Sequence, residues 1–120
     1  MAKVLVTDDA AFMRMMLGNI LRKEGHEVFE AVNGEDMLSK VIDIKPDLVT
    51  LDITMPVLDG LTALKYLKEQ GNTTPVIMCT AMGQQAMVID AISKGASDFV
   101  VKPFEEARVL DAVSKVLGKR

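Results

Sequence analysis

The sequence has a single cysteine, no tryptophan and no hydrophobic run long enough to cross a membrane. One cysteine cannot form an internal disulfide bond, which fits a reducing compartment such as the cytoplasm. A transmembrane helix needs about 20 apolar residues, and a secreted chain needs a signal-peptide core, which the first residues lack. The net charge of −3 disfavours a nucleic-acid-binding surface, which is normally basic. We therefore expect a soluble cytoplasmic protein that binds neither membrane nor nucleic acid.

Aromatic residues are scarce and methionines are common. A chain of 120 residues has room for one domain with a single core, and here four phenylalanines, one tyrosine and nine methionines contribute to it. Methionine adapts to irregular gaps in a core, which accounts for most of the nine. Met82 and Met87 could instead lie on an exposed partner surface.

Strand and helix patterns alternate five times along the chain. Short β-prone apolar runs predict strands at 3–7, 27–31, 48–52, 76–79 and 98–101. Helical periodicity predicts helices at 11–24, 34–44, 59–70, 84–94 and 105–117, and in the second of these we expect Met37, Leu38, Val41 and Ile42 to face inward. This alternation predicts an α/β fold: a doubly wound, five-stranded parallel sheet with helices on both faces.

Polar residues follow four of the five predicted strands. They are Asp8-Asp9 after the first strand, Asp52 after the third, Thr80 after the fourth and Lys102 after the fifth. In the flavodoxin-like strand order 2-1-3-4-5, strands one and three are neighbours at the topological switch point, where ligands bind. The second strand, which offers no ionisable residue at its end, is then the remote edge. Every polar strand end therefore converges on one crevice.

These residue types suit phosphoryl transfer. Three close carboxylates raise each other's pKa unless a cation neutralises them, and oxygen-only ligands suit Mg²⁺. Lys102 offers a point charge and Thr80 a hydroxyl to phosphoryl oxygens. Asp52 is the best candidate nucleophile, because Asp8 and Asp9 remain to hold the metal. We expect in-line attack by Asp52, with catalysis through positioning and charge neutralisation.

Each of these residues also has an ordinary structural interpretation. Asp8-Asp9 could cap the first helix, and Lys102 or Thr80 alone would be a surface lysine or a turn hydroxyl. Their joint placement favours the functional interpretation. Cys79 is expected to be a small buried hydrophobe, and Arg14 a solvated helix residue.

Four motifs at their spacings carry a family resemblance. They are Asp8-Asp9, Asp52-x-x-Met55-Pro56-x-x-Asp59-Gly60, Thr80-Ala81 and Lys102-Pro103. The chain resembles a two-component receiver domain over its whole length, and residues 8–14 and 81–89 are most similar to the stand-alone chemotaxis regulators of that family. The resemblance implies one receiver domain over residues 1–120, with no output domain.

The resemblance also implies site roles. Asp52 would be phosphorylated by a CheA-like histidine kinase, with Mg²⁺ held by Asp9, Asp52 and the backbone carbonyl of Thr54, and with Asp8 assisting through water. The Lys102-Pro103 bond would be cis. Thr80 would move toward the phosphoryl group, and Phe99, where many such regulators have tyrosine, would turn inward. A flagellar switch protein would then bind a surface expected to include Met82, Gln85, Met87, Asp90, Lys94 and Phe99. The protein would be a monomer served by a phosphatase, and no enzyme beyond its own phosphorylation and dephosphorylation.

Other functions remain open at this point. The chain could be a phosphorelay intermediate or a phosphate sink of another two-component pathway. A small Mg²⁺-dependent phosphatase is a remote alternative, because its Asp-x-Asp pattern would need a carboxylate where Thr54 stands. A flavodoxin-like FMN carrier shares the topology, but aromatic residues to hold a flavin are few.

Overall fold

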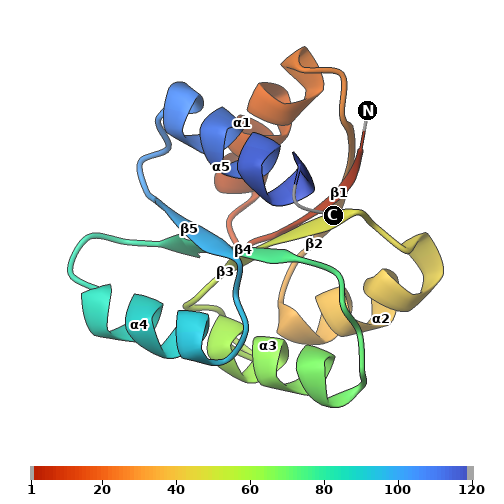
Figure 1. Ribbon diagram of the computed structural model, residues 1–120, viewed down its shortest axis with the longest axis vertical. Coiled ribbons are helices and arrows are strands. Elements are labelled where there is room, and N and C mark those ends of the chain that lie inside the picture. The colour runs from red at the N-terminus through yellow and green to blue at the C-terminus, as the bar shows by residue number, and fades with distance from the viewer. Residues whose placement is uncertain (1, 119–120) are drawn as a thin grey trace.

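A five-stranded parallel sheet lies between two layers of helices in the computed structural model, which describes residues 2–118 (Figure 1). The strands are β1 (Lys3–Thr7), β2 (Glu27–Ala31), β3 (Leu48–Asp52), β4 (Val76–Thr80) and β5 (Asp98–Val101). The helices are α1 (Ala11–Lys23), α2 (Gly34–Ile44), α3 (Gly60–Glu69), α4 (Gln85–Ser93) and α5 (Glu106–Gly118). The strand order is β2-β1-β3-β4-β5, which confirms the predicted topology.

Two separate hydrophobic cores hold the helices on the sheet. Helices α1 and α5 cover one face, and α2, α3 and α4 cover the other (Figure 1). Leu17 and Val113 pack in the first core, whereas Met37 and Leu64 pack in the second. Strands β3 and β4 are buried at every residue, as expected of central parallel strands covered on both faces. This burial fixes the carboxyl ends of the central strands, where the polar residues lie.

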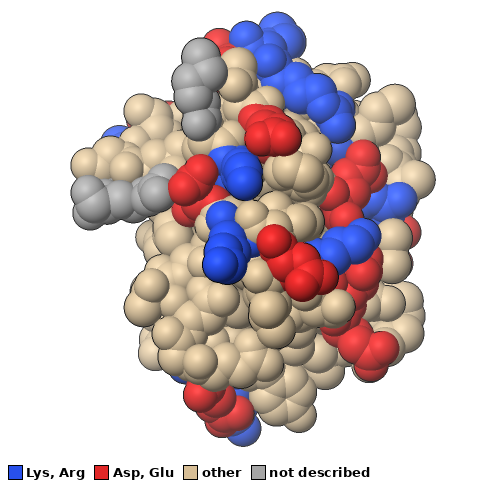
Figure 2. All heavy atoms as spheres, turned by 90° about the vertical axis from the view of Figure 1, so that its right-hand side faces the viewer, with Lys and Arg blue, Asp and Glu red and all other residues tan. Residues whose placement is uncertain are grey.

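The edge strand β2 carries charged residues on its exposed positions. Acidic and basic side chains are interspersed on the face that carries β2 and α2 (Figure 2). Two ion pairs on this face of the protein are Arg14 with Glu30, at 2.7 Å, and Lys40 with Asp36, at 3.1 Å. Such charges discourage pairing of an edge strand with another chain.

The inward face of α2 differs from the prediction at one residue. Met37 and Val41 are buried and Leu38 is half-buried, but Ile42 is 61% exposed. Ile42 follows Val41 by about 100° around the helix, on the flank that neither the sheet nor α3 covers. Ile44 packs against the core instead. The prediction for Ile42 was therefore wrong.

Short polar side chains begin two helices. The side chain of Asn33 accepts a hydrogen bond from the Asp36 N–H, and that of Asp59 accepts one from the Thr62 N–H. Asp59 is therefore the N-cap of α3, and the helix begins one residue later than predicted. Among residues 2–118, none of the helices combines the length and hydrophobicity that a bilayer span requires.

Candidate functional site

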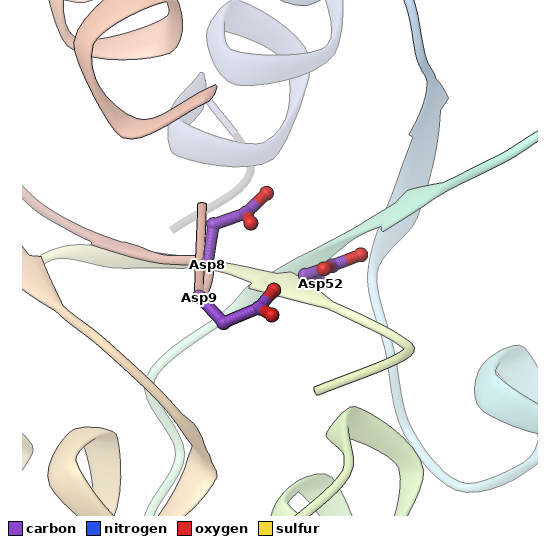
Figure 3. A group of neighbouring side chains, drawn as sticks. All are labelled: Asp8, Asp9 and Asp52. Atoms are coloured by element: carbon purple, nitrogen blue, oxygen red, sulfur yellow. The ribbon is translucent and has the colours of Figure 1, made fainter. Parts of the chain in front are cut away.

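Three carboxylates meet at the carboxyl ends of two neighbouring strands. Asp8 and Asp9 follow β1, Asp52 is the last residue of β3, and these strands pair in parallel. Each residue offers an oxygen within 4.8 Å of the other two (Figure 3). Asp8 and Asp52 are buried, and Asp9 is exposed. The structure therefore brings together the three acids that the sequence singled out.

Lys102 completes this cluster from the end of β5. Its Nζ lies 2.7 Å from Oδ2 of Asp8 and 3.2 Å from Oδ1 of Asp52. Burial by itself lowers the pKa of Lys102, but the hydrogen bond that its ammonium donates to Asp8 and the charge of Asp52 outweigh burial and raise that pKa above its ordinary value. Lys102 therefore stays charged beside the acids. The Lys102–Pro103 peptide bond is cis, as the resemblance implies.

The surroundings of Asp52 disfavour its charge. Burial is the main cause that raises the pKa of Asp52, and the nearby Asp8 carboxylate raises it further. Lys102 acts in the opposite direction without cancelling these effects. A carboxylate in this position gains from any additional cation that reaches the crevice.

Asp8 is fixed by contacts to its side chain and its backbone. Its Oδ1 accepts a hydrogen bond from the Ala10 N–H, and its carbonyl oxygen accepts one from Nη1 of Arg14 at 2.8 Å. The N-cap of α1 is Ala10, without a side-chain cap, so neither acid caps that helix. The expectation that Arg14 is solvated was wrong: its side chain is 13% exposed and joins Asp8, in the loop after β1, to Glu30 of β2. Its role arises from the packing of α1 on the sheet, which one sequence does not reveal.

The loop after β3 runs against the backbone of Asp52. Gly60 donates its N–H to the carbonyl oxygen of Ile53 at 2.7 Å. A Cβ atom at Gly60 would fall on the carbonyl group of Asp52, so only glycine fits there. Thr54 projects its side chain from this loop, and its hydroxyl oxygen accepts a hydrogen bond from Nε2 of Gln84. The assignment of its backbone carbonyl as a metal ligand stays a prediction.

Thr80 and Phe99 line one small cavity next to the acidic crevice. The cavity measures about 200 Å³, and Met82, Gln85, Val88 and Val101 also line it. Thr80 is 2% exposed at the end of β4, and Phe99 is half-buried. The guanidinium of Arg108 lies 5.7 Å from the Phe99 ring centroid and donates to the Phe99 carbonyl oxygen at 2.7 Å. Thr80 and Phe99 therefore share one cavity.

The structure divides the predicted partner surface between two faces of α4. Gln85 faces the cavity beside Phe99, and Met82 is 82% exposed at its rim. Met87, Asp90 and Lys94 follow a three- and four-residue spacing that places them on another face of the helix. Lys94 pairs with Asp90 there at 2.7 Å.

Cys79 lies behind the site and takes no part in it. It pairs with Asp52 in the sheet register and is 2% exposed. Burial raises the pKa of its thiol to about 12, so the thiolate is not available. This agrees with the prediction of a small buried hydrophobe.

The donor set fits a hard divalent cation. The candidate ligands are carboxylate oxygens from Asp8, Asp9 and Asp52, and the exposure of Asp9 leaves a path from solvent. Oxygen ligands beside an open side suit Mg²⁺, which keeps several waters and shares a phosphate oxygen. The raised pKa of Asp52 points the same way, because a cation would relieve the repulsion.

Comparison with known proteins identifies the family. Residues 4–114 match the family model described as the response regulator receiver domain. The chain belongs to this family. The receiver domain is 57% identical to the chemotaxis protein CheY of Bacillus subtilis, over 97% of this chain and 98% of that protein. It is a signalling switch of the CheY type rather than a classical enzyme.

Solved structures agree with this assignment. The receiver domain of NtrX from Brucella abortus superposes with a TM-score of 0.93 at 35% identity, covering 98% of this chain and 99% of that one. The CheX–CheY–BeF3–Mg²⁺ complex of Borrelia burgdorferi matches with a TM-score of 0.90 at 39% identity, covering 95% of this chain and 87% of that one. The receiver fold and the likeness to CheY are thereby shown.

Proposed function

We propose that this receiver domain is a phosphorylation-controlled binding switch of chemotaxis, with Asp52 as the phosphate acceptor. The observation that carries the proposal is the position of Lys102, whose ammonium lies within 3.2 Å of the carboxylates of Asp8 and Asp52. Asp52 is the carboxylate at the end of the central strand, and a cation that binds there stabilises its charged form.

The reaction transfers one phosphoryl group from a histidine kinase. The P–N bond of the kinase phosphohistidine breaks, a P–O bond to a carboxylate oxygen of Asp52 forms, and the freed imidazole nitrogen takes up a proton. Asp9, Asp52 and the backbone carbonyl of Thr54 would hold Mg²⁺, with Asp8 assisting through water, and the ion would supply positive charge beside the acids and the phosphoryl oxygens. Lys102 moves from its pairing with Asp52 to the phosphoryl oxygens, and Thr80 donates its hydroxyl to them.

The output is a change at the cavity beside Phe99. Movement of Thr80 toward Asp52 frees space in the cavity that Thr80 and Phe99 line, and the Phe99 ring fills that space. The surface around Met82, Gln85 and Phe99 then binds a flagellar switch protein. Phenylalanine fills space but donates no hydrogen bond, so shape carries this coupling. The complex of the Borrelia CheY with CheX supports a partner-binding role for this kind of domain.

Intact mass spectrometry tests the phosphorylation. Incubation with a small-molecule phosphodonor and Mg²⁺ should give one phosphoryl adduct, absent without Mg²⁺ and absent in Asp52→Asn. Asp43→Asn, which changes an exposed acid of α2, is the matched control and should form the adduct normally. An adduct that persists in Asp52→Asn would overturn the assignment of the acceptor.

Binding assays test the chemotactic output. Affinity for a flagellar switch protein should rise with phosphorylation in the wild type and stay constant in Asp52→Asn. Phosphoryl transfer onward to a histidine phosphotransfer domain, without such binding, would instead identify a phosphorelay intermediate.

A further inference from the structure

The side chain of Gln84 joins the two loops on either side of the crevice. Its Oε1 accepts a hydrogen bond from the Ala81 N–H at 2.6 Å, and its Nε2 donates to Oγ1 of Thr54 at 3.0 Å. Ala81 belongs to the loop after β4, and Thr54 belongs to the loop after β3. The side chain therefore connects the loop after β4 to Thr54, which lies 30 residues before Gln84 in the sequence.

This bridge is not the ordinary use of a residue at a helix start. Gln84 is the N-cap residue of α4, but its side chain makes no capping hydrogen bond. Its backbone carbonyl accepts from the N–H groups of Met87 and Val88, and its backbone N–H donates to the Ala81 carbonyl, so the contact with Thr54 depends on the side-chain amide. A primary amide offers an acceptor to one loop and a donor to the other.

The two bridged residues lie next to the residues of the proposed reaction. Asp52 pairs with Cys79 in the register of β3 and β4, and Ile53 donates its N–H to the Cys79 carbonyl. In the sequence, Thr54 follows the proposed phosphate acceptor Asp52 by two residues, and Ala81 directly follows Thr80. The Ala81 N–H is part of the peptide unit that begins with Thr80, so it moves when the backbone of Thr80 moves.

We propose that Gln84 is a positioning residue that holds the two loops in the resting arrangement and releases the Ala81 N–H when Thr80 moves toward a phosphoryl group on Asp52. This inference rests on the proposed function and adds a residue that stabilises the unphosphorylated arrangement. The bridge favours the state that has the contacts, and a ligand shifts a conformational equilibrium only by its difference in affinity between the two states. Met82, at 82% exposure and with no polar hydrogen, does not supply a hydrogen bond between the two loops.

Gln84→Met removes both hydrogen bonds and keeps the length of the side chain. Loss of the bridge should shift the equilibrium toward the active arrangement by about three- to tenfold, the range expected for hydrogen bonds that are partly open to solvent. Gln70→Met is the matched control, because it makes the same change at the exposed C-terminal end of α3.

Two readouts on purified protein test the proposal. The first is amide hydrogen exchange of Ala81 without Mg²⁺, which should be faster in Gln84→Met than in the wild type or Gln70→Met. The second is the beryllofluoride concentration that half-saturates the protein with Mg²⁺ present, a probe of the phosphorylated state. It should fall about three- to tenfold in Gln84→Met. A general loss of stability would not lower it. In a Thr54→Val background, which lacks the hydroxyl but keeps the backbone carbonyl, Gln84→Met should have a smaller effect.

The outcomes separate this inference from the proposed function. If Gln84→Met matches Gln70→Met in both readouts, or if it raises the half-saturating concentration, the proposed role of Gln84 is wrong, while the proposed phosphorylation of Asp52 stands. If the wild type takes up neither beryllofluoride nor a phosphoryl group, the proposed function is wrong. The proposed role of Gln84 is then wrong as well, because there is no phosphorylated state whose formation it could oppose.

Discussion

The ammonium nitrogen of Lys102 lies 3.2 Å from Oδ1 of Asp52, so a lysine stands beside the proposed phosphate acceptor. The same nitrogen is bonded to Asp8 at 2.7 Å, and its side chain is 17% exposed. In the metal-free protein it provides the positive charge that Mg²⁺ would otherwise bring. Lys102 and the metal would therefore relieve the same repulsion, that between the carboxylates of Asp8 and Asp52.

Lys102→Gln should destabilise the metal-free protein by about 1–3 kcal/mol, because it leaves two buried carboxylates without their charged partner. Urea unfolding at neutral pH with a chelator measures this. Added Mg²⁺ should then stabilise the variant more than the wild type. The pKa of Lys102 is raised in the fold, so its contribution is complete below the ordinary value of 10.5 and is lost as pH rises through the folded-state pKa.

Lys115→Gln is the control for this change, because Lys115 pairs with Asp111 on the surface at 65% exposure. It should alter stability by less than about 1 kcal/mol. Equal losses in the two variants would contradict the role given to Lys102.

Asp52→Asn should raise the melting temperature of the metal-free protein at pH 7. The pKa of Asp52 is raised in the fold, first by burial and then by Asp8, so its ionised form is less favourable in the folded than in the unfolded chain. This penalty is present above the folded-state pKa and disappears as pH falls below the ordinary value of 3.8. Thermal melts from pH 7 to pH 4 should show a gap that narrows with acid. A variant less stable than wild type at pH 7 would refute this electrostatic account.

Gly60→Ala should lower the unfolding free energy by at least about 2 kcal/mol, because the new methyl group overlaps the carbonyl of Asp52 and the loop must shift. It should also slow formation of the phosphoryl adduct, since that loop carries Thr54. Chemical unfolding and adduct kinetics measure the two effects. Gly118→Ala meets no atom within 4 Å and should be neutral or slightly stabilising. Unchanged kinetics in Gly60→Ala would separate this loop from the reaction.

Val57→Asn should stabilise the protein by about 1 kcal/mol. Val57 has φ of 72° in a turn closed by the Leu58 N–H and the Pro56 carbonyl, a conformation that costs a β-branched residue most. Its side chain is 73% exposed, so little packing is lost. Val32→Asn, at an exposed valine that is not among the residues with positive φ, should give no gain. Differential scanning calorimetry measures the melting temperatures of both variants. Equal shifts in melting temperature would exclude relief of backbone strain at Val57 as the cause.

Local patterns were sufficient to predict the fold. The uniformly apolar strands β3 and β4 and the turn residues after each helix predicted the alternation, and the structure has the predicted strand order. Element ends moved by a residue where a side chain took over as a cap, as Asp59 does for α3. Ile42 was misplaced because periodicity gives the direction of a side chain but not what covers it.

The sequence by itself determined which residues meet at the crevice. Parallel strands end at one edge of the sheet, so Asp8, Asp9, Asp52 and Lys102 converge once the order of strands is known. The tertiary structure alone decided how they are held: Arg14 binds the carbonyl of Asp8, Gly60 lies against that of Asp52, and Gln84 bridges Thr54 and Ala81. Of these contacts only that between Gln84 and Thr54 spans 30 residues of sequence. All of them depend on how the helices and loops pack and on which rotamers the side chains adopt, and the hydrophobic pattern of the sequence specifies neither the packing nor the rotamers.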